Sequence, residues 1–188
     1  MKRPEFFVLS GPNGAGKSTT ATVLLPESLN IEHFVNADLL AMELPYSGDA
    51  AAFEAGRTML ERIHRLRQER VSFAIETTLA ARSYVAFLRE AQNVGYFVHI
   101  VYIWLSSVEL ACTRVAARVR QGGHDVPRHV IKARYDRGLW NFFHLYQPVA
   151  DSWALCDNSG DDLLIVARGS LGEDDEVLRP EIYARIRQ

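Results

Sequence analysis

Residues 11–18 include four positions whose types and spacing could bind phosphate. Gly11, Gly16, Lys17 and Ser18 match the pattern G-x-x-x-x-G-K-S, between the apolar run E-F-F-V-L-S and a helix-like segment. In such a loop, backbone N–H groups and the helix dipole face phosphate oxygens, the lysine reaches the β and γ phosphates, and the serine hydroxyl can bind Mg²⁺. The pattern therefore predicts a nucleoside triphosphate site formed by Gly11, Pro12, Asn13, Gly14, Ala15, Gly16, Lys17, Ser18 and Thr19.

Two carboxylates follow strand-like segments and could act on a second substrate. Asp38 comes 21 residues after Lys17, behind the run H-F-V-N. An aspartate with a pKa of about 4 can orient an alcohol and accept its proton late in the reaction, which predicts an acceptor hydroxyl here. The alternative for Asp38 is the N-cap of a helix over L-L-A-M-E-L.

Glu76, in F-A-I-E-T-T, ends an apolar strand at a Walker-B-like position. Its carboxylate could hold Mg²⁺ through water or hydrogen-bond a substrate, and the alternative is an N-cap or a solvent-facing acid. Thr77 and Thr78 follow it and could equally be turn residues.

Basic residues are concentrated between Arg114 and Arg137, around the flexible turn Q-G-G-H-D-V-P. Two arginine-bearing helices joined by such a turn are typical of a mobile lid, here at about residues 114–137, that brings arginines onto the transferring phosphoryl group and excludes water. Any single arginine could instead lie on a solvated helix face. The basic residues of the segment are Arg114, Arg118, Arg120, Arg128, Lys132, Arg134 and Arg137.

Length and composition restrict the class of protein. The 188 residues favour one domain, covering residues 1–188, and the net charge of −2 gives no global case for nucleic-acid binding. The longest apolar stretch, Y-F-V-H-I-V-Y-I-W-L, is too short to span a bilayer, and the phosphate-binding pattern follows the N-terminus too closely for a cleavable signal. Cys112 and Cys156 form no C-x-x-C pattern and are expected to be reduced thiols. These features predict a cytoplasmic protein.

Strand-like and helix-like segments alternate along the chain, which predicts an α/β fold of the P-loop NTPase type: a three-layer sandwich around a mostly parallel, kinase-like sheet. Ligands then lie beyond the carboxyl ends of the strands, and the turn D-N-S-G-D-D predicts a hairpin of the last two strands. We expect strands at 5–10, 33–36, 72–76, 97–104, 153–156 and 163–167, and helices at 17–25, 49–69, 81–93, 107–120, 127–146 and 178–187.

Three helices carry more detailed expectations. The helix at 49–69 should bury one stripe of apolar residues, namely Phe53, Met59, Leu60, Ile63 and Leu66. The helix at 107–120 should begin with a capping box between Ser106 and Glu109. The aromatic half of the helix at 127–146 is expected to be core, namely Trp140, Phe142, Phe143 and Tyr146.

Six segments in order resemble the small bacterial zeta-toxin-like P-loop kinases: S-G-P-N-G-A-G-K-S-T-T, N-A-D, A-A-A-F-E-A-G-R-T-M-L, F-A-I-E-T-T-L-A, R-V-A-A-R-V-R-Q-G-G-H-D-V-P and R-Y-D-R-G-L-W-N-F. The resemblance implies transfer of the γ phosphate of ATP to the 3′-hydroxyl of the sugar in UDP-N-acetylglucosamine. It also implies a small antitoxin, which can be a separate chain. The lid is shorter than in the larger toxins, so the acceptor is less determined than the chemistry.

The resemblance also implies roles for single residues. Lys17 and Ser18 match the ATP and metal residues, Asp38 the acidic residue that activates the acceptor, and Glu76 and Thr78 the E-x-T acceptor pair. Arg118 matches the first phosphate-binding lid arginine, and the second could be Arg120, Arg128 or Arg134. Of these, Arg134 is taken with Arg118 as catalytic and Arg120 as nucleotide-binding. Arg57 is a further candidate for contacting the acceptor, and Asn158, in C-D-N-S-G, for lining the adenine.

Other functions compatible with the same residues are a kinase for a nucleoside, an antibiotic hydroxyl or a polynucleotide end, a regulatory or switch NTPase, and a nucleotide-binding module without turnover. The chain has no N-K-x-D pattern for reading guanine, which favours ATP over GTP. No membrane contact is expected. Nucleic acid is also disfavoured as a partner, because the aromatic residues of the basic segment gather at one end instead of alternating with the arginines.

Overall fold

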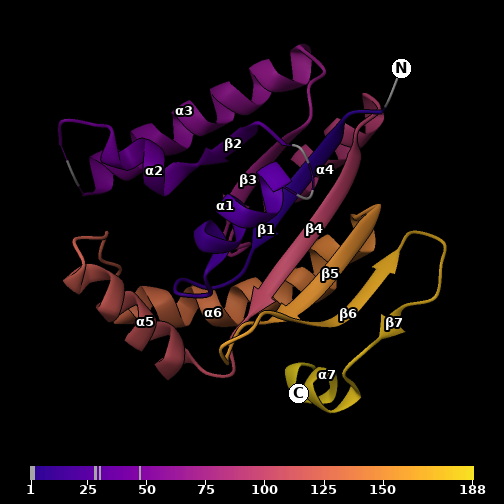
Figure 1. The fold of residues 1–188 in the computed structure, drawn as a ribbon. Coiled ribbons are helices and arrows are strands. Elements are labelled where there is room, and N and C mark those ends of the chain that lie inside the picture. Colours follow the sequence, from indigo (N-terminus) through magenta and orange to yellow (C-terminus); the bar gives the residue numbers. More distant parts are fainter. Residues whose placement is uncertain (1–2, 28, 30, 47) are drawn as a thin grey trace.

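The structure is a computed structural model that describes residues 3–27, 29, 31–46 and 48–188. Within this part of the chain, one sheet has the strand order β2-β3-β1-β4-β5-β6-β7. The first five strands in this order are parallel, β6 is antiparallel to β5, and β7 is antiparallel to β6 (Figure 1). Their bounds are β1 (Glu5–Ser10), β2 (His33–Asn36), β3 (Phe73–Thr77), β4 (Phe97–Trp104), β5 (Ser152–Asp157), β6 (Leu164–Ser170) and β7 (Glu176–Val177).

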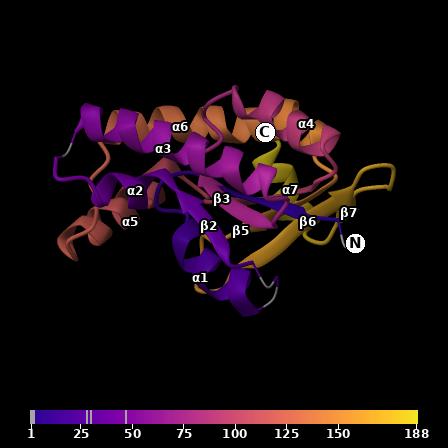
Figure 2. The same ribbon diagram turned by 90° about the horizontal axis from the view of Figure 1, so that it is seen from above.

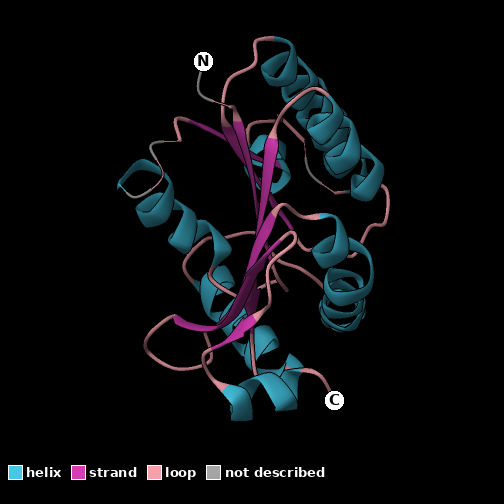
Figure 3. Cartoon of the chain, turned by 90° about the vertical axis from the view of Figure 1, so that its right-hand side faces the viewer, coloured by secondary structure: helices cyan, strands magenta, loops and turns pink. Residues whose placement is uncertain are grey.

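Helices cover both faces of the sheet, as the edge-on view in Figure 3 shows. Seen from above in Figure 2, α3, α4 and α6 lie on one side and α1 lies on the other. A π-helical turn (Phe142–Tyr146) and a short 3₁₀ turn (Gln147–Val149) follow α6. The bounds are α1 (Lys17–Glu27), α2 (Ala37–Met42), α3 (Asp49–Gln68), α4 (Tyr84–Asn93), α5 (Val108–Arg120), α6 (Arg128–Asn141) and α7 (Pro180–Ile186).

The central strand β1 is buried on both faces. Phe6 and Val8 pack with α3, α4 and the turn after α6, whereas Phe7 and Leu9 pack with α1. Such a continuous apolar run is typical of a parallel strand between two helix layers. The three-layer sandwich and the β5–β6 hairpin predicted from the sequence are both confirmed.

Several local expectations were wrong. The cap of α5 is Ser107, whose Oγ accepts a hydrogen bond from the Leu110 backbone N–H at 3.1 Å, and not Ser106. Phe53 and Leu60 on α3, and Trp140 on α6, are exposed rather than core, because the buried side of each helix is carried by the other apolar residues. A helix at the position of α2 was considered only as the alternative for Asp38, and the strand β7 was not expected.

The remaining expectations on burial hold. Met59, Ile63 and Leu66 are buried on α3, as are the three aromatic residues of the π-helical turn, Phe142, Phe143 and Tyr146. Cys156 is buried and Cys112 half-buried, and both thiols are free. Among the described residues, no helix has both the length and the apolar character needed to cross a membrane.

Candidate nucleotide and acceptor site

The loop between β1 and α1 has the shape of a phosphate-binding loop. Gly11 has φ +137°, and a Cβ there would lie 2.1 Å from the Ile103 carbonyl oxygen on β4. Gly16 has φ +84°, and its Cβ would lie 2.7 Å from Asn158 Nδ2. Both positions need glycine for backbone conformation and for space. Asn158 Nδ2 also donates to the Ala15 carbonyl oxygen at 2.8 Å, so it braces the loop, and its predicted contact with adenine stays a prediction.

Lys17, at the start of α1, is folded back over this loop. Its Nζ donates to the Pro12 carbonyl oxygen at 2.9 Å and lies 3.7 Å from Glu76 Oε1. The side chain is only 6% exposed, and this burial lowers the pKa of the ammonium group, whereas the carboxylates of Glu76 and Asp38 oppose the shift. The charge on Lys17 therefore depends on the neighbouring acids, and its contact with phosphate stays a prediction.

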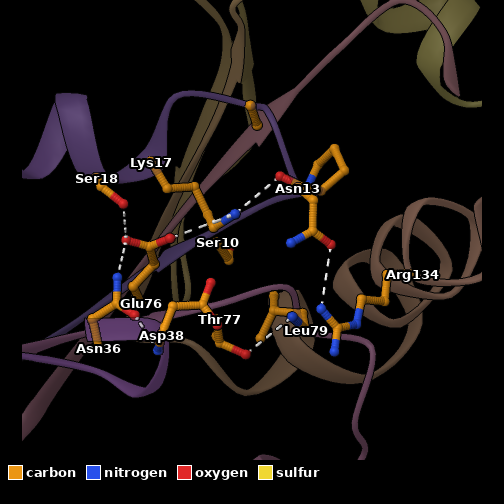
Figure 4. A network of polar contacts seen from close by, with 12 residues as sticks. Ser10, Asn13, Lys17, Ser18, Asn36, Asp38, Glu76, Thr77, Leu79 and Arg134 are labelled. Atoms are coloured by element: carbon orange, nitrogen blue, oxygen red, sulfur yellow. Dashed lines mark hydrogen bonds and ion pairs between the residues drawn. The ribbon is translucent and has the colours of Figure 1, made fainter. Parts of the chain in front are cut away.

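Glu76, at the end of β3, joins the loop to β2. Its Oε2 accepts hydrogen bonds from Ser18 Oγ and from Asn36 Nδ2, both at 2.7 Å (Figure 4). Asn36 and Glu76 are opposite each other in the β2–β3 register. Asn36 Oδ1 also accepts from the Asp38 backbone N–H at 2.8 Å and so caps α2. Asn36, and not Asp38, is thus the N-cap of α2, so the Asp38 carboxylate is not used for capping this helix.

Three hollows meet at Asp38. One of about 320 Å³ lies along the phosphate loop and is also lined by Lys17, Glu76 and Arg118. A smaller one of about 140 Å³ adds Thr78. A third of about 520 Å³ opens toward the α2–α3 connection and is lined by Ala37, Asp38, Ala41, Met42, Leu44, Pro45, Tyr46, Gly48, Ala51, His124 and Arg134. Asp38 is the one residue common to these three linings, so it lies between the phosphate side and a larger, partly apolar space.

Two arginines of the predicted lid line these hollows. Arg134 on α6 lines the hollows of about 140 Å³ and 520 Å³, and its Nη1 donates to Asn13 Oδ1 at 3.4 Å (Figure 4). Arg118 on α5 lines the phosphate hollow and donates from Nη2 to the His124 carbonyl oxygen at 2.7 Å. Its Nε is buried without a hydrogen-bond partner in the described part of the chain.

Three other predicted arginines lie apart from the site. Arg57 is exposed on α3, where it pairs with Glu54 and Glu61. Arg128 pairs at 3.7 Å with Glu109 and is 73% exposed. Arg120 is exposed at the end of α5. None of the three lines the described hollows around Asp38, so Arg134 is the second lid arginine that the geometry favours.

Four residues at the site were given no individual role in the sequence prediction, although Arg114 belongs to the predicted lid. Asn36 donates a hydrogen bond to Glu76, and it lies opposite Glu76 because of the register between β2 and β3. Arg114 Nη1 donates to the Asn158 carbonyl oxygen at 2.7 Å and lines the phosphate hollow. Met59 and Tyr84 line the 140 Å³ hollow from α3 and α4. In the sequence, Met59 belongs to the expected apolar stripe and Tyr84 has no motif, so only the packing of the helices identifies them.

The donors beside the loop fit a magnesium ion. The described residues contain no cluster of three or more His, Cys, Asp or Glu side chains that could hold a metal by themselves. The Ser18 hydroxyl and the Glu76 carboxylate are hard oxygen donors 2.7 Å apart, next to where phosphates would lie. Mg²⁺ is usually held in this way, by one or two protein oxygens, with waters and substrate phosphates as the other ligands.

Comparisons with known proteins identify the family. The family model described as Zeta toxin matches residues 1–155. An uncharacterized protein of Haemophilus influenzae is 32% identical over 129 residues, which are 66% of this chain and 88% of that protein.

Three solved structures are similar in fold. The crystal structure of AvrRxo1-ORF1:-ORF2 with ATP has a TM-score of 0.79 and 19% identity over 98% of this chain, which spans only 63% of that one. The PezAT toxin–antitoxin system of Streptococcus pneumoniae has a TM-score of 0.68 and 19% identity, covering 84% of this chain and 69% of that one. A gluconokinase from Sinorhizobium meliloti has a TM-score of 0.52 and 18% identity, covering 85% and 86%. The chain therefore belongs to the zeta-toxin family and has the fold of a P-loop kinase.

Proposed function

We propose that the protein is a Mg–ATP-dependent kinase that transfers the γ phosphate to a hydroxyl group of a small molecule, with UDP-N-acetylglucosamine as the first acceptor to test. The observation that carries this proposal is the position of Asp38. Its carboxylate lines the hollow of the phosphate loop and also the 520 Å³ space beyond it. A protein that only hydrolyses ATP does not need a second, partly apolar space on the far side of the carboxylate.

The roles of the residues follow from their contacts. Lys17 and the phosphate loop would hold the β and γ phosphates, and Arg118 and Arg134 would neutralise the charge that spreads over the transferred phosphoryl group. Ser18 and Glu76 would hold Mg²⁺, which supplies further positive charge at the phosphates when bound. Asp38 would orient the acceptor hydroxyl and take its proton as the new bond forms, while Thr78 and Glu76 hold the acceptor.

The larger hollow supports an acceptor with an apolar or aromatic part. Its volume of about 520 Å³ is in the usual range for a small-molecule site. Met42, Leu44, Pro45 and Tyr46 line this hollow together with Asp38. A sugar nucleotide combines hydroxyl groups at one end with a flat base at the other, so it suits a lining that is partly apolar and partly charged.

We also propose a single domain over residues 1–188, cytoplasmic action where ATP and Mg²⁺ are available, and neutralisation by a separate antitoxin chain. The partner proposal is supported by two neighbours in fold, since AvrRxo1-ORF1 was solved with ORF2 and PezAT is a toxin–antitoxin system. A test is co-expression with the product of a neighbouring gene. Rescue of growth together with a stable complex would support the proposal, and a harmless kinase that needs no partner would contradict it.

The test of the kinase proposal is to incubate the purified protein with Mg–ATP and UDP-N-acetylglucosamine, beside a panel of nucleosides, sugars, hydroxyl antibiotics and oligonucleotides, and to weigh the products by mass spectrometry. Asp38→Asn should lower transfer by at least about 100-fold and leave the affinity for ATP within about threefold of wild type. Asp136→Asn, an exposed acid on α6, is the matched control and should transfer normally. Release of ADP with every acceptor unmodified would instead indicate a switch NTPase.

A further inference from the structure

The segment after Glu76 has an unusual backbone at Leu79. This side chain is fully buried, yet its φ is +54°, in the left-handed region that residues with a Cβ seldom adopt. A conformation of this kind persists only where surrounding contacts hold it. The segment also carries Thr77 and Thr78, which line the 140 Å³ hollow with Asp38. The contacts that hold Leu79 therefore also affect the position of Thr77 and Thr78 beside Asp38.

Two of these contacts fix both ends of the Leu79 peptide unit. Thr77 Oγ1 accepts a hydrogen bond from the Leu79 N–H at 3.2 Å (Figure 4). Asn141 Nδ2, on the last turn of α6, donates to the Leu79 carbonyl oxygen at 2.7 Å. Asn141 is only 2% exposed, so without it this carbonyl group would lose its partner inside the protein.

A third contact lies one turn earlier on α6. Gly138 packs so closely on the segment that a Cβ there would be 2.4 Å from the Thr78 carbonyl oxygen. In a helix interior, alanine is normally more favourable than glycine. The glycine at position 138 is therefore explained by the close approach of α6 to Thr78, and not by the needs of the helix. Without a shift of the backbone, only glycine lets α6 and residue 78 lie at this separation.

The same helix reaches the phosphate loop. Arg134, Gly138 and Asn141 are spaced by four and three residues and so lie on one side of α6. Arg134 contacts Asn13 of the loop at 3.4 Å, while the other two hold Thr78 and Leu79. One rigid helix thus touches the nucleotide side and the acceptor side of the site.

We propose that Gly138 and Asn141 are positioning residues: they hold Thr77–Leu79 on α6 and thereby fix the acceptor contacts of Thr78 and Glu76 relative to the phosphate loop. This rests on the proposed kinase function. Both residues act through the segment and neither touches the reacting atoms.

The test compares Gly138→Ala with Gly56→Ala. Gly56 is also inside a helix, but its Cβ would meet no atom within 4 Å, so this variant should match wild type. Gly138→Ala should raise the KM for the acceptor by about tenfold or more, while the KM for ATP changes by less than about twofold. A merely structural defect would raise both constants or lower the amount of folded enzyme without such a split. Equal effects on both constants would overturn the proposal.

A second pair of variants removes a buried donor. Asn141→Leu leaves the Leu79 carbonyl oxygen unpaired, whereas Tyr96→Phe removes a buried hydroxyl that donates to the backbone carbonyl groups of Leu66 and Val71, before β3. Amide hydrogen exchange over residues 77–82 should be about tenfold faster in Asn141→Leu and unchanged in Tyr96→Phe.

The hydrogen-exchange measurement needs no acceptor. It therefore tests whether α6 holds residues 77–79 in place independently of the proposed kinase function. If wild type binds ATP but phosphorylates nothing in the panel, the kinase proposal fails. Faster exchange in Asn141→Leu would then still support the contact of α6 with the segment. Unchanged exchange in Asn141→Leu would overturn the inference whatever the acceptor.

Discussion

Glu76→Gln removes the charge that faces Lys17 across 3.7 Å and keeps a side chain of the same shape. The two side chains are only 9% and 6% exposed. Removing one partner of a buried ion pair typically costs about 3–5 kcal/mol, because the other charge is left without compensation. Asp38 also faces Lys17, and a glutamine can still accept a hydrogen bond from Ser18 or Asn36. We therefore expect a loss of about 2–3 kcal/mol in the free energy of unfolding.

The assay is thermal unfolding of the ligand-free protein, followed by circular dichroism near neutral pH. In a chain of this length, 1 kcal/mol shifts Tm by about 2–4 °C, so Glu76→Gln should lower Tm by about 4–12 °C. The matched control is Glu176→Gln. Glu176 pairs with Arg168 at the shorter distance of 2.6 Å, but the two side chains are 51% and 58% exposed. Exposed pairs contribute about 0–1 kcal/mol, so this control should unfold within about 4 °C of wild type.

The reasoning is refuted if the two variants unfold at the same temperature, or if Glu76→Gln is more stable than wild type. Either result would mean that solvent in the hollow screens the pair of Glu76 and Lys17 as it screens a surface pair. The site would then hold its lysine by the backbone contact to Pro12, and not by the carboxylate.

Three further predictions concern the nucleotide side. Because burial lowers the pKa of Lys17 below 10.5, its charge is lost as the pH rises toward that value, and titrations from about pH 7 to about pH 9.5 should show ATP affinity falling. A flat profile would contradict this. Asn158→Ala removes the hydrogen bond to the Ala15 carbonyl oxygen and should weaken ATP binding by about 5- to 30-fold in calorimetry, whereas binding at wild-type strength would show that the loop needs no brace. Arg118→Ala should lower kcat by about 100-fold or more and change the KM for ATP by less than about threefold; a change confined to the KM for ATP would count against the lid role.

The sequence predicts the parts of the site that depend on local pattern. The loop from Gly11 to Ser18 is contiguous, and its strand and helix flanks are recognisable from their composition. Asp38 and Glu76 follow from the rule that parallel strands end at one edge of the sheet. The double role of Asn36 could not be found in this way, since it depends on which residue of β3 lies opposite it.

The lid illustrates the same limit. The basic segment predicts two helices and a turn, but it does not give the rotation of the helices about their axes. The sequence therefore leaves open whether Arg120, Arg128 or Arg134 is the second arginine at the phosphates. Only the packing of α6 on the sheet turns Arg134 toward Asn13 and leaves Arg128 in solvent. Trp140 was misjudged for a related reason, because the aromatic composition of the helix does not say which aromatic residue faces outward.

The strand order sets when the nucleotide site can form during synthesis. The strand that leads into the phosphate loop is made before the other described strands but lies in the middle of the sheet, where Phe6 pairs with Phe73 and Val98. The brace from Asn158 to the loop comes later still. At about 5–20 residues per second, residue 158 follows residue 17 by roughly 7–28 s. Contacts so distant in sequence also form slowly. In a nascent chain of this protein, the phosphate-binding motif is therefore made many seconds before Asn158, and the described arrangement of the loop can form only when the far strands arrive.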